Sequence, residues 1–387
     1  MNITIVCDLL GKQNNRTTIA TLNLEKFFIY SKKHKVTVVS NDFEGTEIPE
    51  ENRCYLPNFR MGYFATAALK RNGISLALPV KKILRKAIAD ADVVHIQLPF
   101  LIGINAAKIA KKMHKPVTAS FHAQAENITS HFFNLIESKF VNNLIYRFVY
   151  HTMYKRCDCV HFPTKFIKDV FESEQGHETN GYVITNGVNN IFKDKKLDRK
   201  NEKFTIVCSG RFSKEKAQHL LIEAVAKSKH RDEIKIIFAG SGPLAQKCEQ
   251  LALQKNVDAQ ISFFSRTDLV NLLNTANLYV HTAYIEIEAI SCLEAICCGL
   301  VPLINNAHRS ATKAFALEKE NLFNENDTDD LTEKIDYFFE HPEVIAKLKK
   351  EYEKMQIQFD QSECLRLMEI MFSDAIDLNN KNNQAHK

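Results

Sequence analysis

The sequence predicts an α/β protein made of two doubly wound, Rossmann-like domains, and three observations lead to this expectation. A chain of 387 residues suits two domains better than a single core. Short apolar runs alternate with amphipathic stretches, as in a parallel sheet covered by helices. This alternation begins again near residue 203, after a polar segment.

In the first half, the helix-like stretches lie near 18–32, 104–113 and 131–156 and separate five strand-like runs. These runs cover 3–7, 36–40, 92–97, 116–121 and 158–163. The second half repeats the pattern with strand-like runs at 203–210, 234–242, 259–265, 278–282 and 300–304. Between the halves, 189–203 is charged and lacks either periodicity, so we expect it to be a linker.

We therefore expect an N-terminal domain over 1–188 and a C-terminal domain over 189–359. The remaining segment, 360–387, is predicted to be a helix that returns to the N-terminal domain, followed by a polar tail. Open parallel sheets bind ligands outside the carboxyl ends of their strands. The site is accordingly expected in a central cleft that these ends of both domains face.

Composition and charge narrow the classes of protein. Hydrophobic residues make up 45% and charged residues 25%, as in a soluble globular protein. No apolar run reaches membrane-spanning length, and no leader segment is recognisable, so a cytoplasmic location is expected. The ten cysteines show no zinc or disulfide spacing, which favours buried, reduced thiols.

The net charge of +5 is unevenly distributed. Residues 1–190 contain 24 Lys and Arg against 16 Asp and Glu, whereas 191–387 contain 27 against 30. A basic half favours anionic partners, which include nucleic acids, phosphate-bearing substrates and acidic membrane surfaces.

The residues that carry chemistry gather in the second half. Gly210 and Arg211 end a strand, and Lys216 follows at the start of a predicted helix, so two cations and free backbone N–H groups could bind a diphosphate. Alternatively, both are solvated loop charges. Glu286 and Glu294 could accept hydrogen bonds from sugar and ribose hydroxyls, and Gly242 lies in a glycine turn that allows close approach of a ligand.

Together these motifs resemble family 4 of the retaining glycosyltransferases, which have the two-domain GT-B fold. The matching stretches are VITNGVNNIF (183–192), GRFSKEKAQHLLIEA (210–224), FAGSGP (238–243) and EIEAISCLEAICCGLVPLI (286–304). The resemblance implies that Arg211 and Lys216 neutralise the donor diphosphate, that Glu286 binds the transferred sugar and that Glu294 holds the ribose.

The same resemblance implies further donor contacts. The backbone after Glu286 is expected near the phosphates, and His122 in SFHAQAEN is expected near the donor sugar and the reaction centre. A lone histidine at a strand end can equally be a satisfied structural residue. The remaining predicted donor-binding residues are Asn15, Arg16, Gly210, Gly242, Ile287, Ala289 and Ile290.

Three positions depart from the family pattern. Arg16 stands where many relatives have a glycine beside the donor phosphates, and it either adds a phosphate contact or reshapes the acceptor entrance. Ala217 and Ala289 also replace glycines, one after the phosphate lysine and one after Glu286. These departures leave the donor chemistry plausible and the identity of the sugar open.

A closer resemblance concerns 120–129 and 279–323, which look very like bacterial cholesterol α-glucosyltransferases. Diacylglycerol α-glucosyltransferases are somewhat less similar. This resemblance implies UDP-glucose as the donor, a lipid as the acceptor, no obligatory metal or other cofactor, and a location on the inner face of the cell membrane.

The segment 131–156 independently suggests an anionic membrane partner. Its apolar residues recur every fourth position, with basic residues between them, and a second basic stretch surrounds Lys81, Lys82, Arg85 and Lys86. The alternative is a core helix, and both hold if the helix is apolar on two sides. The apolar positions are Phe132, Ile136, Phe140, Leu144 and Phe148.

Three functions remain in competition. The first is α-glucosylation of a sterol or diacylglycerol, and the second is a cell-envelope or capsule polysaccharide glycosyltransferase of the same fold. The third is a non-catalytic nucleotide- or nucleic-acid-binding protein, which lacks RNA-binding signatures and leaves both glutamates unexplained. Nucleic acid is therefore not expected as a partner. The acceptor, the hexose, the nucleotide and the oligomeric state stay open.

Overall fold

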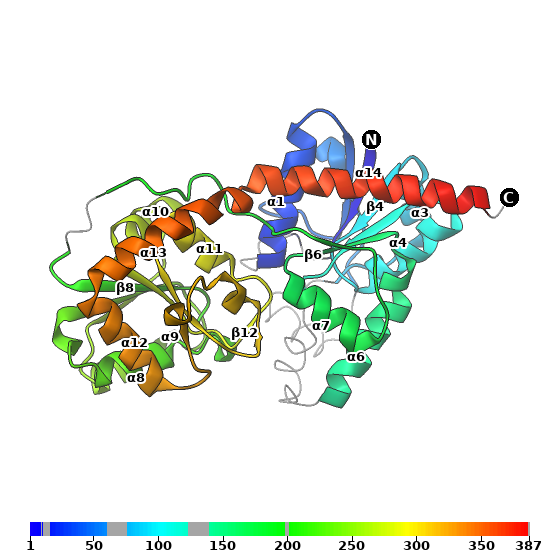
Figure 1. Ribbon diagram of the computed structural model, residues 1–387. Coiled ribbons are helices and arrows are strands. Elements are labelled where there is room, and N and C mark those ends of the chain that lie inside the picture. The colour runs from blue at the N-terminus through cyan, green and yellow to red at the C-terminus, as the bar shows by residue number, and fades with distance from the viewer. Residues whose placement is uncertain (9, 11–15, 60–75, 123–138, 198–200, 386–387) are drawn as a thin grey trace. The chain divides into compact units, whose positions relative to one another are not determined.

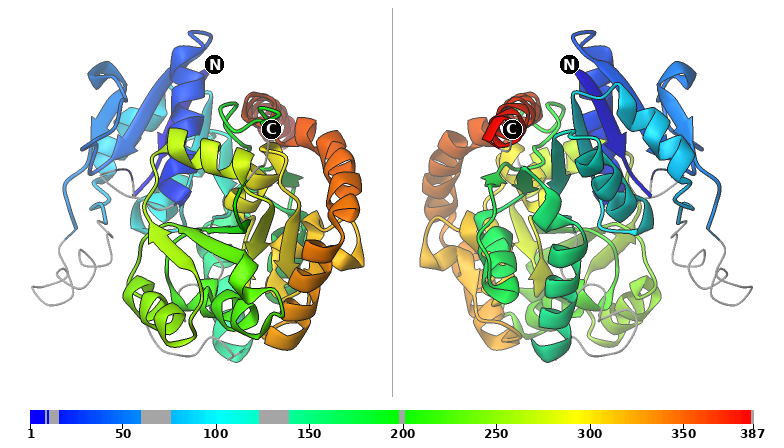
Figure 2. Two further views of the ribbon diagram at one scale, coloured as in Figure 1. Left: turned by 90° about the vertical axis from the view of Figure 1, so that its left-hand side faces the viewer. Right: turned by 90° about the vertical axis from the view of Figure 1, so that its right-hand side faces the viewer.

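A computed structural model describes residues 1–8, 10, 16–59, 76–122, 139–197 and 201–385. It divides into two compact units, each with its own sheet and helices (Figures 1 and 2). The first unit comprises Met1–Thr185 together with Leu365–Lys387, and the second comprises Asn186–Cys364. The long helix α14, Gln361–Ala385, thus contributes most of its length to the first unit.

The sheet of the first unit has seven parallel strands in the order β3-β2-β1-β4-β5-β6-β7. From β1 the strand order runs outward to β3 on one side and to β7 on the other, as in a doubly wound sheet. The central strands are buried on both faces and are mainly apolar, with a few polar side chains such as His95 and Thr118 among them. The strands are Asn2–Val6, Lys35–Ser40, Arg53–Tyr55, Val93–Ile96, Val117–Ser120, Cys159–Phe162 and Gly181–Val183, for β1 to β7.

Helices cover both faces of this sheet. Right-handed crossovers place α1, Arg16–Tyr30, on one face and the helices that follow β3, β4, β5 and β6 on the other. These are α3 Lys81–Ala89, α4 Leu101–Lys112, α6 Lys139–Thr152 and α7 Lys165–Gln175. Helix α14 lies on the face of α1, where the Phe372 ring stacks on that of Phe28, with centroids 5.3 Å apart.

The second unit has a six-stranded parallel sheet in the order β10-β9-β8-β11-β13-β15 and a two-stranded sheet, β12-β14. The strands are β8 Phe204–Ser209, β9 Ile234–Ala239, β10 Ala259–Ser262, β11 Leu278–His281, β12 Ile285–Glu286, β13 Pro302–Asn305, β14 Arg309–Ser310 and β15 Leu322–Phe323. The helices are α8 His219–Lys227, α9 Ala245–Gln254, α10 Arg266–Thr275, α11 Ile290–Cys297, α12 Thr328–Glu340 and α13 Pro342–Met355.

These observations confirm the predicted α/β class with two doubly wound sheets. Helix α12 is capped by Asp327, whose carboxylate accepts hydrogen bonds from the backbone N–H groups of Asp329 and Asp330. The ten cysteines are free thiols, and eight of them are buried. Among the residues that the structure describes, no helix combines the length and apolar character needed to span a membrane.

Three details of the sequence interpretation were wrong. The helix predicted over 131–156 ends at Thr152 and is followed by a 3₁₀ turn, Tyr154–Arg156, while 131–138 lies outside the described residues. The polar tail expected after the C-terminal helix instead continues α14 as far as Ala385. Lys216 does not lie inside a helix, because a 3₁₀ turn over Lys214–Lys216 precedes α8.

Candidate functional site

In the second unit, two glycine turns follow the neighbouring strands β8 and β9. Gly210 and Gly242 have φ angles of 147° and 156°, which favour glycine. A Cβ at Gly240 would lie 2.0 Å from the Gly210 carbonyl oxygen, and one at Gly242 would lie 2.5 Å from the Phe212 nitrogen. The glycines are therefore required for the two turns to pack backbone against backbone, whether or not they also contact a ligand.

An ion pair joins two of the predicted site residues. The Lys216 ammonium donates to the Glu286 carboxylate, and their side chains are only 12% and 9% exposed. The Nε2 atom of His281 lies 3.6 Å from the same Glu286 oxygen. A buried carboxylate needs such partners, because burial without them is costly. The structure thus brings together residues that are 70 positions apart in the sequence.

The turn that carries Lys216 is fixed by its backbone. The Lys216 carbonyl accepts a hydrogen bond of 2.6 Å from the Thr282 hydroxyl, and the Glu215 carbonyl accepts one of 3.0 Å from the Tyr284 N–H. Ala217 then turns the chain with a positive φ of 48°. The end of β11 therefore determines where the lysine stands.

Arg211 lies next to this turn, and its side chain is exposed. Its carbonyl accepts a hydrogen bond of 2.9 Å from the buried Gln218 amide. This anchors the backbone and leaves the guanidinium accessible to an anion. A planar, bidentate donor of this kind suits a phosphate.

The segment after Glu286 leads into the N-terminus of α11. Ala289 has a φ of 59° and directly precedes the helix, whose first residue is Ile290. Glu288 is buried and accepts hydrogen bonds from both the backbone N–H and the side-chain amide of Asn186, the former at 2.8 Å. Glu294, on α11, is half-buried. The loop thus presents backbone N–H groups at a helix N-terminus, where anions bind favourably.

In the first unit, the carboxyl ends of the adjacent strands β1, β4 and β5 carry three polar residues. Asp8, Gln97 and His122 follow these strands, and Gln97 Oε1 lies 3.0 Å from His122 Nε2. Burial lowers the pKa of His122 to about 3, so the ring is neutral at pH 7. Burial raises the pKa of Asp8 to about 7, although its Oδ1 accepts a hydrogen bond of 3.0 Å from the Ala77 N–H.

The sequence analysis did not single out Asp8, Gln97, His281 or Glu288. Asp8 and Gln97 each directly follow a buried strand run, and this signal alone would have marked them as candidates. Of the predicted residues, Asn15 lies outside the described part of the chain. Arg16 is the first residue of α1. The predicted roles of all these side chains stay predictions.

Helix α6 is apolar on two sides. Tyr146 is buried on one side, whereas Phe140, Leu144 and Phe148 are 80%, 60% and 59% exposed. These three residues, spaced four apart, form a stripe on the outward face, which we call the α6 stripe. Helix α3, on the same face of the sheet, exposes its basic side chains Lys81, Lys82, Arg85 and Lys86. The more N-terminal Phe132 and Ile136 lie outside the described residues.

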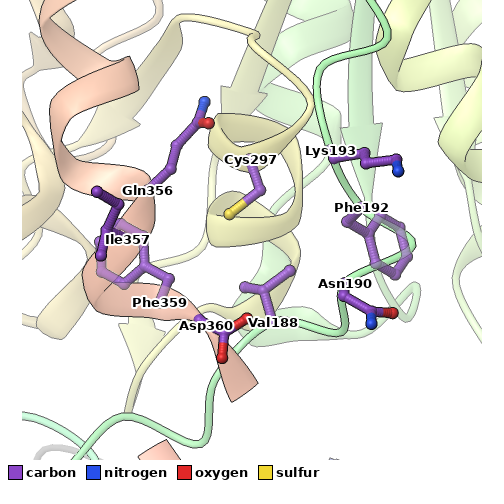
Figure 3. Close-up of a pocket in the computed structure, with 9 residues that line it drawn as sticks. All are labelled: Val188, Asn190, Phe192, Lys193, Cys297, Gln356, Ile357, Phe359 and Asp360. Atoms are coloured by element: carbon purple, nitrogen blue, oxygen red, sulfur yellow. The ribbon is translucent and has the colours of Figure 1, made fainter. Parts of the chain in front are cut away.

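A cavity of 430 Å³ lies elsewhere in the second unit, between 188–193 and 356–360 (Figure 3). Cys297 lines it, and burial raises the pKa of this thiol to about 12, so it is unreactive at neutral pH. The cavity includes none of the predicted site residues. In the described part of the chain, no cluster of three or more His, Cys, Asp or Glu is arranged to hold a metal ion.

Comparisons with known proteins agree with this architecture. The family model for Glycosyl transferases group 1 matches residues 189–355, and the model for Glycosyltransferase Family 4 matches residues 29–190. Anabaena HepE, solved in complex with UDP, aligns over 96% of this chain and 100% of its own with a TM-score of 0.75. Its identity of 15% makes it evidence for the fold alone.

Two similar proteins are named for a specific glucosyltransferase activity. The α-monoglucosyldiacylglycerol synthase of Acholeplasma laidlawii is 24% identical over 331 residues, which cover 80% of this chain and 82% of that enzyme. The catalytic domain of cholesterol-α-glucosyltransferase from Helicobacter pylori is 40% identical over 40% of this chain and 99% of that domain, with a TM-score of 0.38.

Proposed function

The chain belongs to the family 4 glycosyltransferases, and we propose that it transfers glucose from UDP-glucose to a membrane lipid, forming an α linkage. The acceptor class that we propose is a sterol or a diacylglycerol. Both relatives described above are named for α-glucosylation of such lipids. The observation that carries the chemistry is the buried Lys216–Glu286 pair next to the exposed Arg211.

In this proposal the cations act on the leaving group. Arg211 and Lys216 stabilise the negative charge that grows on the UDP β-phosphate as the sugar–phosphate bond breaks. The N-terminus of α11, with Ile287, Ala289 and Ile290, adds backbone donors to the phosphates. No metal is required, because these groups already supply the positive charge that a metal would bring.

The carboxylates and the histidine orient the donor. Glu286 accepts hydrogen bonds from the transferred glucose, Glu294 accepts them from the ribose, and His122 binds a glucose hydroxyl. The acceptor hydroxyl attacks the anomeric carbon from the face that UDP leaves, which retains the α configuration. The acceptor proton passes to the departing phosphate oxygen.

The first unit supplies the membrane contact in this proposal. The α6 stripe enters the interfacial region of the bilayer, and the basic side chains of α3 attract anionic headgroups. Exposed phenylalanine and leucine at helical spacing are unfavourable in water, and a membrane surface removes that cost. The protein would thus be a peripheral enzyme on the inner face of the cell membrane.

The direct test is transfer of radiolabelled glucose from UDP-glucose into vesicles that contain cholesterol, diacylglycerol or neither. Label in one lipid establishes both the reaction and the acceptor. Release of free glucose without labelled lipid would support the donor and point to a polysaccharide acceptor. No turnover with any acceptor, combined with tight RNA binding, would overturn the proposal.

The leaving-group assignment has a separate test. We expect Arg211→Ala and Lys216→Ala each to lower kcat by about 10²-fold or more, because removal of one group that stabilises transition-state charge has effects of this size. Lys214→Ala, an exposed lysine in the same turn, is the matched control and should keep full activity. EDTA should leave the rate unchanged. Full turnover of either variant would contradict the assignment.

A further inference from the structure

Gln97 contacts His122 through a part-buried hydrogen bond between their side chains. The backbone N–H of Gln97 donates to the Val6 carbonyl at 3.0 Å, which fixes the residue beside the end of β1. Its side chain is buried, at 1% exposure, and its Oε1 atom lies 3.0 Å from His122 Nε2. The two residues are distant in sequence and meet because the strands that precede them, β4 and β5, are neighbours in the sheet.

This contact selects one form of the imidazole ring. A carbonyl oxygen can only accept a hydrogen bond, so Nε2 must carry the hydrogen. In a neutral ring the other nitrogen, Nδ1, then has a free lone pair and can accept a hydrogen bond. The low pKa of His122 keeps the ring in this neutral form at physiological pH.

The buried network around His122 has the same uncharged character. His161 Nε2 donates to the Ile184 carbonyl at 2.6 Å, so its Nδ1 accepts from the Ser120 hydroxyl at 2.9 Å. Ser120 Oγ must then accept from His95 Nε2, 3.1 Å away, and His95 Nδ1 accepts from the Thr118 hydroxyl, 2.9 Å away. Every donor in this series of hydrogen bonds meets an acceptor, and each histidine in it is neutral.

His161, on strand β6, is a second cause of the low pKa of His122, and His161 and His122 both lower the pKa of His95 on β4. Burial lowers the pKa of His161 to about 4 and that of His95 well below its usual value. The His161 ring lies 5.9 Å from the His122 ring, edge to face. Protonation of His122 is therefore opposed mainly by burial, and also by His161 wherever that ring is charged.

We propose that Gln97 is a positioning residue that keeps His122 in the Nε2–H form, so that Nδ1 accepts a hydrogen bond from a hydroxyl of the transferred sugar. This inference rests on the proposed function, which assigns His122 to the sugar. It adds a second residue to the sugar site, and it assigns His122 the role of a neutral acceptor and not that of a cation.

Two variants of Gln97 test the assignment. Gln97→Met keeps the size of the side chain and removes the acceptor, and we expect kcat/KM for UDP-glucose to fall roughly tenfold, as for loss of one hydrogen bond. Gln97→Glu places a carboxylate beside Nε2 and raises the pKa of His122. Activity of this variant should then decline as the pH falls from 8 to 6, whereas the wild-type rate should stay flat with respect to this group.

Thr4→Val is the matched control, because it removes the hydrogen bond from the buried Thr4 hydroxyl to the Ala87 carbonyl in the same sheet, outside the histidine network. It should leave the pH profile unchanged. Imidazole ¹⁵N shifts provide a readout that does not depend on activity: His122 should have a protonated Nε2 in the wild type and a mixture of forms in Gln97→Met. A protonated Nδ1 in the wild type, or unchanged shifts and kinetics in both Gln97 variants, would overturn the inference.

Failure of the proposed function looks different. Full turnover by His122→Ala would remove His122 from the sugar site, while the ¹⁵N shifts would still report whether Gln97 sets the ring form. The two assignments can therefore fail independently.

Discussion

At the scale of single residues, two alanines occupy backbone conformations that normally belong to glycine. Ala217 and Ala289 have φ angles of 48° and 59° and are 3% and 1% exposed. They flank the ion pair, since Ala217 follows Lys216 and Ala289 lies three residues after Glu286. The chain thus adopts left-handed turns at two positions that have no glycine. A β-carbon in this region costs about 1–2 kcal/mol.

Replacement of Ala217 by glycine should therefore not follow the usual rule for buried alanines. We expect Ala217→Gly to leave the free energy of unfolding unchanged or to raise it by up to about 1 kcal/mol, because relief of the strained φ offsets the lost methyl group. The control, Ala224→Gly inside α8, should lower it by about 1 kcal/mol. Urea denaturation followed by circular dichroism measures both, and equal losses would contradict the strain at Ala217.

At the scale of elements, α6 has two apolar faces with different partners. Tyr146 faces the core, where its ring lies 6.3 Å from that of Phe121, whereas the α6 stripe faces outward. A helix needs only one apolar face to pack on a sheet. Packing on the sheet therefore accounts for only one of the two faces, and we propose that a lipid surface covers the other.

Exchange of the α6 stripe for serine tests this account. We expect Phe140→Ser, Leu144→Ser and Phe148→Ser together to weaken binding to anionic vesicles at least tenfold, because buried apolar area at the interface is lost. Stability should change little, since the side chains are exposed. Leu253→Ser on α9, 77% exposed in the second unit, is the control and should bind as the wild type. Vesicle sedimentation gives the affinities, and equal binding by the triple variant would exclude the stripe.

At the scale of the whole molecule, the buried ionisable groups of the first unit fall into two sets that have opposite effects on how stability depends on pH. His95, His122 and His161 have lowered pKa values. Their contribution to the free energy of unfolding is therefore present above pH 6.5 and is lost as the pH falls towards 4. Asp8 and Glu25 have raised pKa values, so their contribution is present at low pH and is lost as the pH rises. Stability should accordingly decline on both sides of a maximum.

The variant Asp8→Asn tests the loss of stability that is expected as the pH rises. The pKa of Asp8 rises from 3.8 to about 7 on folding, so its ionisation opposes folding by up to about 4 kcal/mol at pH 8. The amide keeps the acceptor for Ala77 and carries no charge. We expect the variant to be more stable than the wild type at pH 8 and nearly equal to it at pH 4. Asp90→Asn, at an exposed position, should show no such pH dependence in urea titrations.

Much of this molecule could be predicted from the sequence because strand and helix periodicities are local. The contacts of the site join residues far apart in the sequence, so these local patterns do not reveal them. Gln97 and His122 are 25 residues apart and meet only through the order of strands. The Lys216–Glu286 pair likewise requires the parallel pairing of β8 with β11. The two faces of α6 could not be assigned either, since periodicity reveals an apolar face but not what covers it.

The division of the chain has a consequence for how the protein forms during its synthesis. The second unit is continuous in sequence, and the passages that enter and leave it are paired, with Val188 donating to the Phe359 carbonyl at 2.7 Å and accepting from Gln361 at 3.2 Å. It can therefore complete its fold as soon as residue 364 has left the ribosome. The first unit begins earlier but lacks α14, whose Phe372 covers Phe28 and His95. The earlier half of the nascent chain must hence wait, with an uncovered apolar face, until α14 has been translated.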